Sequence, residues 1–205
     1  MNGFFISFEG GEGAGKSTQI NLLVEALNSK GFEVEFGAEP GKTEIGLECR
    51  RLLKDTNLNP NPISELLLFE VARSEHVEKD IIPKLEKGLI YISDRFTDSS
   101  IVYQGIVRGL GVNKVKELND LVTNNLQPDL TFVLDVDSKQ GLSNSVEVDR
   151  LELEGNDFHK KVNESFRNLK DLFPERNIIL VPRMSIEEVH KFVFEKTLKF
   201  LNVNK

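Results

Sequence analysis

The glycine-rich run from Gly10 to Ser17 is the clearest chemical signature in the chain. It reads GGEGAGKS and fits the pattern G-x-x-x-x-G-K-[ST] in full. Glycines let the backbone turn tightly, so consecutive N–H groups can face phosphate oxygens where a helix begins. In such a loop Lys16 reaches the β- and γ-phosphates, and the Ser17 hydroxyl binds Mg²⁺. The run therefore predicts a site for a nucleoside triphosphate.

Every position of this loop is a candidate for binding the triphosphate. The predicted ATP-binding residues are Gly10, Gly11, Glu12, Gly13, Ala14, Gly15, Lys16, Ser17 and Thr18. A glycine-rich turn with an exposed lysine is the alternative, but the run separates an apolar strand pattern from an amphipathic helix pattern, which favours a phosphate site. The loop does not specify the reaction, because GTPases, ATPases and small-molecule kinases share it. Guanine recognition is unsupported, since the closest string to Asn-Lys-x-Asp, at residues 113–116, ends in lysine.

A second group of polar residues follows a later strand pattern. Residues 92–104 read ISDRFTDSSIVYQ, which places Asp94 and Arg95 at the carboxyl end of a predicted strand and hydroxyl and amide groups on the helix after it. Ligands bind at that end of the strands in an open parallel sheet. Taken alone, Asp94 and Arg95 could equally form a structural ion pair. The segment is a candidate for a second ligand site.

Together with the glycine loop, the segment from Asp94 to Gln104 resembles the thymidylate kinase family. Further segments agree with that family in order and spacing: Glu39-Pro40-Gly41, Arg50-Arg51-Leu52-Leu53, Leu67-Leu68-Phe69 followed by Arg73, and Asp149-Arg150-Leu151-Glu152. The similarity spans nearly the whole chain. It implies a P-loop kinase that transfers the γ-phosphoryl group of ATP to thymidine 5′-monophosphate (dTMP), with Mg²⁺ as cofactor. The product is the diphosphate, on the route to dTTP, and the resemblance implies a homodimer.

The resemblance also implies a site for dTMP beside the loop. The predicted acceptor-binding residues are Glu12, Glu39, Arg50, Phe69, Arg73, Arg95, Ser99, Ser100, Tyr103 and Gln104. Phe69 would stack on the thymine ring, and Ser100 and Gln104 would read the edge of the base. Tyr103 would crowd the position of a ribose 2′-OH, and Glu12 would accept a hydrogen bond from the 3′-OH.

Two anionic nucleotides that meet end to end need cations between them. Arg50, Arg73 and Arg95 can supply planar forks for the oxygens of the acceptor phosphate. The predicted catalytic residues are Lys16, Asp94, Arg95 and Arg150, and the predicted metal-binding residues are Ser17 and Asp94. Asp94 is interpreted as a carboxylate that positions the acceptor or a magnesium-bound water. It is not interpreted as a strong base, because phosphoryl transfer depends mainly on alignment and charge stabilisation.

The predicted lid departs from the family pattern. Bacterial members with glutamate at the position of Glu12 carry several lid arginines, but residues 141–148 contain no basic residue and leave Arg150 as the only lid arginine. Gly13 stands where the eukaryotic type has arginine. We therefore expect Arg150, together with Lys16 and Mg²⁺, to stabilise the transition state. A salt bridge from Arg150 to Asp149, Glu152 or Glu154 is the alternative.

The elements that must position these residues alternate along the chain. Strand patterns occur at residues 3–8, 32–36, 89–93, 129–136 and 177–181, and helix patterns at 16–30, 43–54, 62–87, 97–107, 113–124, 156–171 and 185–201. This alternation is typical of βαβ units. We predict one α/β domain over residues 1–205 with the P-loop NTPase fold, a five-stranded parallel sheet with helices on both faces, and a short lid at about 137–157. Pro83 should kink or restart the third helix, and Gly88 should end it.

The composition is that of an ordinary globular protein. The 205 residues are 39% hydrophobic and 29% charged, which disfavours a disordered chain, a collagen or a disulfide scaffold. A formal charge of −7 disfavours general nucleic-acid binding. No apolar run reaches the length of about 18 residues that a membrane span needs, and no signal peptide is recognisable, so we expect the cytoplasm. The single Cys49 cannot form an internal disulfide and is interpreted as a packing residue.

Two other functions stay open at this stage. One is another P-loop nucleoside or nucleotide kinase with a different acceptor. The other is a non-catalytic nucleotide-binding regulator, for which the arginine-poor lid is the only support. The apolar stripes at 62–80 and 113–124 could form a dimer face, although such stripes usually cover a sheet.

Overall fold

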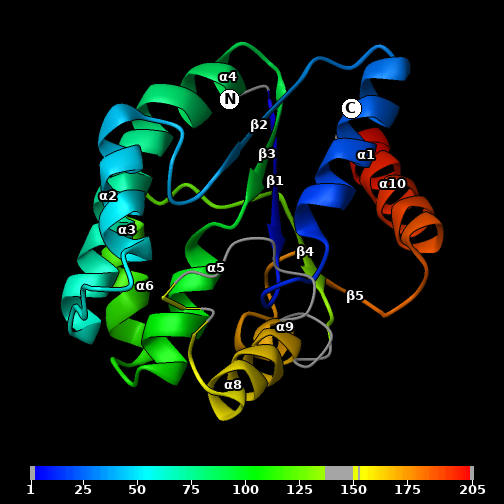
Figure 1. The fold of residues 1–205 in the computed structure, drawn as a ribbon. Helices are drawn as coiled ribbons and strands as arrows, with labels where there is room; N and C mark the ends of the chain where they lie inside the picture. The colour runs from blue at the N-terminus through cyan, green and yellow to red at the C-terminus, as the bar shows by residue number, and fades with distance from the viewer. Residues whose placement is uncertain (1–2, 137–149, 152, 204–205) are drawn as a thin grey trace.

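The five predicted strands form a single parallel sheet. The structure is a computed structural model that describes residues 3–136, 150–151 and 153–203. The strands are β1 (Phe4–Glu9), β2 (Val34–Ala38), β3 (Ile90–Asp94), β4 (Leu130–Leu134) and β5 (Ile178–Val181), in the order β2-β3-β1-β4-β5 (Figure 1). Every neighbouring pair is parallel. The predicted fold class is confirmed, whereas most of the predicted lid, residues 137–149 and 152, lies outside the described residues.

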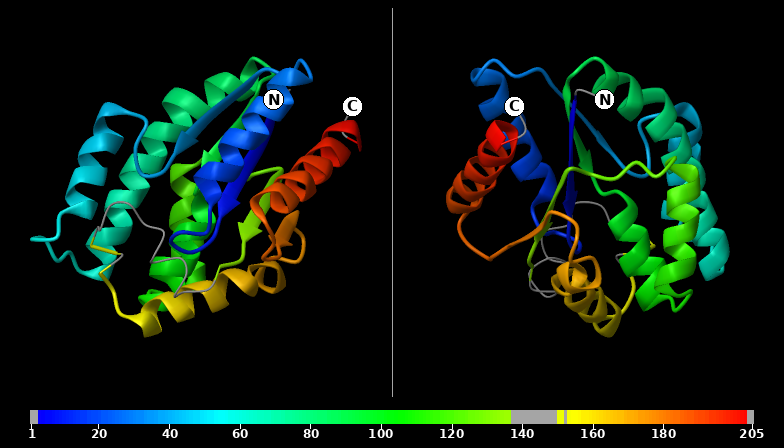
Figure 2. Two further views of the ribbon diagram at one scale, coloured as in Figure 1. Left: turned by 45° about the vertical axis from the view of Figure 1, so that its right-hand side comes forward. Right: turned by 180° about the vertical axis from the view of Figure 1, so that it is seen from behind.

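Helices cover both faces of this sheet. One face carries α1 (Lys16–Ser29) and α10 (Ile186–Val203), which pack side by side (Figure 2). The other face carries α2 (Glu44–Lys54), α3 (Pro62–His76), α4 (Ile82–Glu86), α5 (Thr97–Ser100) and α6 (Val112–Val122). Helices α8 (Asn156–Arg167) and α9 (Leu169–Leu172) lie toward the carboxyl ends of the strands. Among the described residues, no helix combines the length and apolar character needed to cross a membrane.

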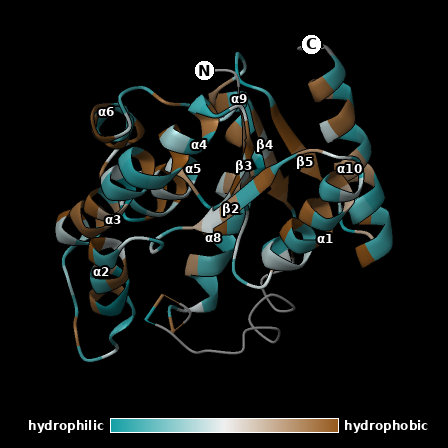
Figure 3. Cartoon of the chain, turned by 90° about the horizontal axis from the view of Figure 1, so that it is seen from above, coloured by the Kyte–Doolittle hydropathy of each residue, from teal (hydrophilic) through white to brown (hydrophobic). Residues whose placement is uncertain are grey.

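The alternating side chains of β1 explain the two layers. Phe4, Ile6 and Phe8 pack into a core with residues of α1 and α10. Phe5 points to the opposite face, where it packs against Leu85 of α4. A strand buried on both faces reads as a continuous apolar run, as FFISF does here. In Figure 3, β4 and β5 are mostly brown, whereas the surrounding helices mix brown and teal.

Two of the predicted helices contain a π-helical turn. Helix α3 is followed by the π-helix η1 (Val77–Ile81), and α4 then begins with Pro83 in its first turn. The helix thus restarts at Pro83 as predicted, because proline lacks the N–H that a continuing α-helix would use. Gly88, with φ of 84°, follows the end of this helix. The predicted helix at 97–107 consists of α5 and the π-helix η2 (Ile101–Val107), and the one at 156–171 divides at Asn168 into α8 and α9.

The register of the three strands on one side of the sheet brings the predicted site together. Phe8 of β1 and Ala38 of β2 both pair with Asp94 of β3. The glycine loop after β1, Glu39 after β2 and Arg95 after β3 therefore leave the sheet at neighbouring points of the same edge. The structure thus places three segments that are far apart in the sequence around one site.

Candidate active site

The glycine loop has the backbone that its sequence predicts. Gly15 precedes α1 with φ of 84°, a left-handed conformation that side chains disfavour. A Cβ on Gly10 would come within 2.6 Å of the Leu134 carbonyl oxygen of β4. The buried Lys16 ammonium donates to the carbonyl oxygens of Gly10 (3.3 Å) and Gly11 (3.2 Å). Burial, aided by nearby Arg95, lowers the pKa of Lys16.

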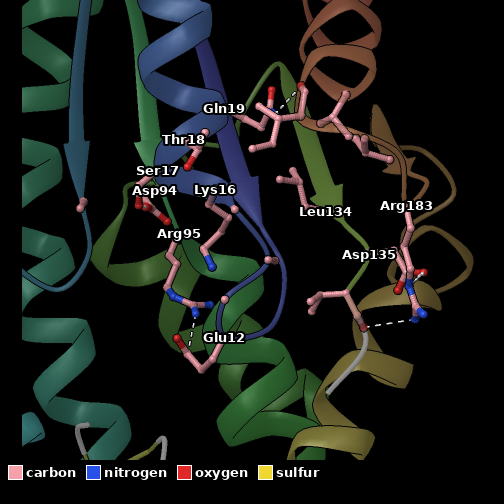
Figure 4. A pocket seen from close by; sticks show the side chains of 18 of the residues that line it. Glu12, Lys16, Ser17, Thr18, Gln19, Asp94, Arg95, Leu134, Asp135 and Arg183 are labelled. Atoms are coloured by element: carbon pink, nitrogen blue, oxygen red, sulfur yellow. Dashed lines mark hydrogen bonds and ion pairs between the residues drawn. The ribbon is translucent and has the colours of Figure 1, made fainter. Parts of the chain in front are cut away.

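A cavity of about 910 Å³ opens around this loop (Figure 4). The predicted ATP-binding residues from Glu12 to Thr18 line it, and Gly10 and Gly11 lie next to it, where Lys16 binds their carbonyl groups. The opposite wall includes Leu134, Asp135 and Arg183, which the sequence analysis missed. Arg183 donates from Nε to Asp135 at 3.0 Å. The volume falls in the range usual for sites that bind small molecules and cofactors.

Ser17 and Asp94, the residues predicted to bind Mg²⁺, are hydrogen-bonded to each other. The Ser17 hydroxyl donates to Oδ2 of Asp94 at 2.9 Å, and Figure 4 shows the two side chains next to each other beside the loop. Mg²⁺ prefers oxygen ligands and usually binds through one or two protein groups, together with waters and substrate phosphates. Among the described residues, no cluster of three or more histidines, cysteines and carboxylates is found. This hydroxyl and carboxylate pair fits Mg²⁺ that arrives with a nucleotide.

Arg95 connects the glycine loop to the helix after β3. Its backbone has a φ of 72°, and its guanidinium donates to the Gly10 carbonyl oxygen (3.0 Å), to Ser99 Oγ (3.1 Å) and to Glu12 Oε1 (2.6 Å). The Tyr103 hydroxyl also donates to Glu12, at 3.0 Å. Burial by itself raises the pKa of Glu12, but Arg95 and then Lys16 outweigh it and lower that pKa to about 2. Glu12 is therefore an anion at neutral pH.

A buried carboxyl group below Arg95 holds the turn after β3. Glu9 is fully buried and accepts hydrogen bonds from the Phe96 N–H (2.8 Å) and the Ser99 hydroxyl (2.6 Å). Burial, with a further contribution from Asp98, raises the pKa of Glu9 to about 8. Sequence analysis missed Glu9, whose only signal is a charged residue at the end of an otherwise apolar strand pattern. The bonds to the Phe96 N–H and the Ser99 hydroxyl hold the segment that follows Arg95 against the end of β1.

A second cavity of about 210 Å³ adjoins the first. All of the predicted acceptor-binding residues except Arg73 line it: Glu12, Glu39, Arg50, Phe69, Arg95, Ser99, Ser100, Tyr103 and Gln104. They come from the loops after β1, β2 and β3, from α2 and α3, and from the helix formed by α5 and η2. Four of them, Glu12, Glu39, Arg50 and Arg95, also line the larger cavity. The two cavities therefore share a wall that carries two acidic and two basic side chains.

Arg73 lies beneath this wall and not in the cavity. Its side chain is 1% exposed and donates to Glu39 (2.9 Å), Glu70 (2.5 Å), Ser100 (2.9 Å) and Asn119 (2.8 Å). Burial alone would lower the pKa of Arg73, but the two carboxylates raise it, so the group is a permanent cation. That Arg73 holds the acceptor phosphate stays a prediction, because its guanidinium is bound here to protein groups alone. Two buried carboxylates need a cation, and Arg73 supplies it.

Glu39 stands at the boundary of the two cavities, but both of its carboxylate oxygens already have protein partners. Oε2 accepts from Arg73, and Oε1 lies 3.0 Å from Nδ1 of His76. His76 Nε2 in turn lies 2.7 Å from the Tyr91 hydroxyl. His76 was missed by the sequence analysis, although it follows Arg73 by one helical turn. That Glu39 binds the acceptor stays a prediction.

Arg150 is joined to Leu53, a residue that lines the acceptor cavity. Its Nε donates to the Leu53 carbonyl oxygen at 3.2 Å, and its NH2 forms a salt bridge of 2.6 Å with Glu65 of α3. Arg150 lines neither cavity, although the neighbouring Leu151 lines the smaller one. That Arg150 stabilises charge on the transferring phosphate stays a prediction, because its guanidinium is bound here to protein groups alone. A salt bridge forms, as the alternative had it, but with a carboxylate 85 positions away in the sequence.

The fold and the shared wall define a class of protein. A glycine loop at the start of α1 has the sequence and backbone of a phosphate-binding loop, and a second cavity adjoins the cavity around it at a wall that includes Glu12 and Arg95. A site that only bound or hydrolysed a nucleotide would not need a second, base-sized cavity on the far side of its terminal phosphate. These features place the protein among the P-loop kinases that act on small acceptors.

Comparison with known proteins identifies the family. The family model described as thymidylate kinase matches residues 8–193. Thymidylate kinases from Thermoanaerobacter sp. (strain X514) and Thermosipho africanus (strain TCF52B) are 41% and 44% identical to this chain, with coverage of 98% and 95% of it and 100% and 99% of those proteins. The crystal structure of thymidylate kinase from Ehrlichia chaffeensis superposes with a TM-score of 0.77 at 35% identity, and the match covers 95% of this chain and 98% of that one. The chain belongs to the thymidylate kinase family.

Proposed function

We propose that this protein transfers the γ-phosphoryl group of ATP to dTMP, giving ADP and dTDP. The observation that carries the proposal is the wall shared by the two cavities, which Glu12, Glu39, Arg50 and Arg95 line from both sides. Phosphoryl transfer needs the donor and acceptor phosphates almost in contact and in line, and the only place where both sites meet in the described structure is this wall. Membership of the thymidylate kinase family indicates dTMP as the acceptor for the smaller cavity.

The donor end uses the main chain of the loop and Lys16. Backbone N–H groups of the glycine loop and the amino end of α1 attract the phosphates of ATP. The Lys16 ammonium, which binds two loop carbonyl groups, lies where the terminal phosphates would enter. Ser17 and Asp94 would hold Mg²⁺. When bound, Mg²⁺ would neutralise charge on the donor phosphates.

The acceptor end uses side chains from several elements. Arg50 is bound to the Pro40 carbonyl oxygen at 3.0 Å, and its guanidinium, which has five N–H donors in all, lines both cavities. Arg95 lies beside it and is held by Glu12 and Ser99. These two cations would attract the acceptor phosphate and align its oxygen with the donor. Phe69 offers a ring to the base, and Tyr103 and Glu12 stand where the sugar would lie.

An assay of ADP formation tests this function. The protein is mixed with ATP, Mg²⁺ and, in separate reactions, dTMP, dUMP, UMP or thymidine. We expect the highest kcat/KM with dTMP and a much lower value with UMP, because Tyr103 and Glu12 leave little room for a ribose 2′-OH. A preference for thymidine or UMP would indicate a different kinase. Nucleotide binding without any turnover would indicate a regulator.

The variant Asp94→Asn tests the role of the carboxylate at the end of β3. We expect kcat to fall by about 10²-fold, since the variant removes a charge next to Ser17, while the KM for dTMP changes much less. Steady-state kinetics with dTMP and ATP varied separately measure both values. Unchanged turnover would remove Asp94 from the mechanism.

We also propose that the protein is a cytoplasmic homodimer. Helix α3 carries three apolar side chains at helical spacing that are about half exposed in the single chain: Ile63 (48%), Leu67 (48%) and Val71 (47%). An exposed stripe of this kind is suited to contact with another protein surface. Light scattering after size-exclusion chromatography measures the mass, and Leu67→Glu should shift it from dimer toward monomer. A wild-type mass of one chain would contradict the dimer.

A further inference from the structure

Glu65 is a buried carboxylate that the proposed reaction does not use. It lies on α3, one helical turn before Phe69, and is 1% exposed. Its Oε1 accepts from Nε2 of Gln104 (2.8 Å) and Nε of Arg108 (3.3 Å). Its Oε2 accepts from NH2 of Arg108 (3.2 Å) and NH2 of Arg150 (2.6 Å). A carboxylate removed from water in this way, with this many partners, calls for an explanation.

Glu65 is ionised, and this limits what it can bind. Burial alone would raise the pKa of Glu65, but the hydrogen bonds from Gln104, Arg108 and Arg150 outweigh it and lower that pKa. An ionised carboxylate only accepts hydrogen bonds. The end of the Gln104 carboxamide that faces Glu65 must therefore be its nitrogen. A glutamine side chain can otherwise present either its oxygen or its nitrogen, so Glu65 removes this freedom.

The fixed carboxamide belongs to the wall of the acceptor cavity. Gln104 lines the cavity, whereas Glu65 does not. With its nitrogen bound to Glu65, the carboxamide has its oxygen as the acceptor that it can present to a ligand. Thymine and uracil have an N–H at ring position 3, which can donate to that oxygen. Cytosine has an unprotonated nitrogen there, which would meet the oxygen as a second acceptor.

We propose that Glu65 is a specificity-determining residue that acts through Gln104. It fixes Gln104 as a hydrogen-bond acceptor and thereby favours a pyrimidine with a ring N–H over cytosine. The inference rests on the proposed function, because it assigns a base selection to the proposed acceptor site. Glu65 is a positioning residue, since the group that touches the base is Gln104.

The variant Glu65→Gln tests the proposal. A glutamine at position 65 can accept or donate, so Gln104 regains both orientations. The measurement is kcat/KM for dTMP and for dCMP, in wild type and variant. We expect the dTMP to dCMP ratio to fall by at least about tenfold, because a site that hydrogen-bonds its substrate rejects a mismatched one strongly. If both substrates slow by the same factor, Glu65 is merely structural and the proposal is overturned.

Glu154→Gln provides the matched control. Glu154 is the other carboxylate on Arg108, at 2.6 Å, and has no recorded contact with Gln104 in the described structure. Neutralising Glu154 removes one ion pair of the same arginine, and it leaves the bond between Glu65 and Gln104 in place. We expect the dTMP to dCMP ratio to stay at the wild-type value. An equal fall in Glu65→Gln and Glu154→Gln would assign the selection to Arg108 and overturn the proposal.

A second variant covers the case in which Glu65→Gln does not fold. Glu65→Asp keeps a charge for the two arginines but draws the carboxylate back from Gln104, so it should also lower the ratio. An unchanged ratio in a folded Glu65→Asp overturns the proposal. Wild-type protein that phosphorylates neither nucleotide overturns the proposed function and this inference with it. Wild-type activity on dTMP, with an unchanged ratio in the Glu65 variants, overturns the inference alone.

Discussion

The two cavities are built by different means. Much of the donor cavity comes from one continuous stretch, Glu12 to Gln19, in which the backbone makes the phosphate site. The acceptor cavity is about a quarter of that volume, 210 against 910 Å³, and takes its lining from segments spread between Glu12 and Leu151. Its side chains are held in turn by buried partners such as Glu9, Arg73 and Glu65.

The difference follows from what each cavity must recognise. A triphosphate is the same in every nucleoside triphosphate, so backbone N–H groups in a fixed loop suffice to bind it. A particular base must be distinguished from close analogues, which requires side chains held in one orientation. We therefore expect substitutions at the donor end to change mainly turnover. Substitutions beneath the acceptor wall should change stability and selectivity.

Lys16→Met should have the largest effect on turnover and little effect on stability. The Lys16 ammonium binds only loop carbonyl groups among the described contacts, and removing it takes away a cation at the transferring phosphate. We expect kcat to fall by about 10³-fold, with thermal unfolding near that of wild type. Steady-state kinetics and a thermal melt measure the two. A loss of less than tenfold would mean that the donor end does not depend on Lys16.

Arg73→Met should have the largest effect on stability. It leaves Glu39 and Glu70 buried without their cation, a change that typically costs about 3–5 kcal/mol. Urea denaturation measures the free energy of unfolding. The control is Arg50→Met, which removes an arginine from the cavity surface. Arg50→Met should leave stability nearly unchanged and raise the KM for dTMP by about tenfold. Equal stability of the two variants would contradict the distinction between Arg50, which lines the cavity, and Arg73, which supports the wall from beneath.

Glu9→Gln should change the pH dependence of stability. The pKa of Glu9 is raised from 4.5 to about 8 by burial and by Asp98. Between these values the folded protein keeps a proton that the unfolded chain releases, so this group makes the free energy of unfolding fall as pH rises toward 8. Glutamine cannot titrate, so the variant should show a flatter profile over this window. Urea denaturation at a series of pH values measures it, and identical slopes would contradict the assignment.

Arg150→Ala should have the smallest effect on turnover. Its guanidinium is bound to Glu65 and to the carbonyl group of Leu53, a residue that lines the acceptor cavity. We expect kcat to fall by less than about tenfold, since the group lies away from the transferring phosphate, with a modest rise in the KM for dTMP. A fall in kcat approaching that of Lys16→Met would place Arg150 at the donor phosphates after all.

The sequence predicts the fold and the donor end well because both depend on local patterns. Apolar runs separated by amphipathic helices suffice for a parallel sheet, and the glycine loop is contiguous. Most members of the acceptor wall follow from the resemblance to the family. What the sequence could not predict is which buried polar groups are paired with each other. Glu65 with Arg150 and Glu9 with Ser99 are 85 and 90 positions apart, and their pairing depends on strand order and helix packing.

Arg73 shows what a motif leaves out about the surroundings of a residue. Its position in the family pattern and its charge suggest a phosphate ligand. Only its burial and its bonds to Glu39 and Glu70 show that it supports the wall from behind. The interruption of the predicted helices at η1 and η2 was likewise invisible, because a π-helical turn leaves the apolar spacing almost unchanged.

The π-helical turn η2 makes the acceptor site depend on chain length as well as on residue type. Tyr103 and Gln104 both lie within it. A π-helical turn accommodates one more residue than an α-helical turn, and each residue of an α-helix advances the next by about 100°. Deleting a single residue between Ile101 and Tyr103 would let the segment rewind as an ordinary helix and swing both side chains around its axis. A shortening by one amino acid, with Tyr103 and Gln104 themselves retained, would thus be enough to remove both side chains from the acceptor cavity.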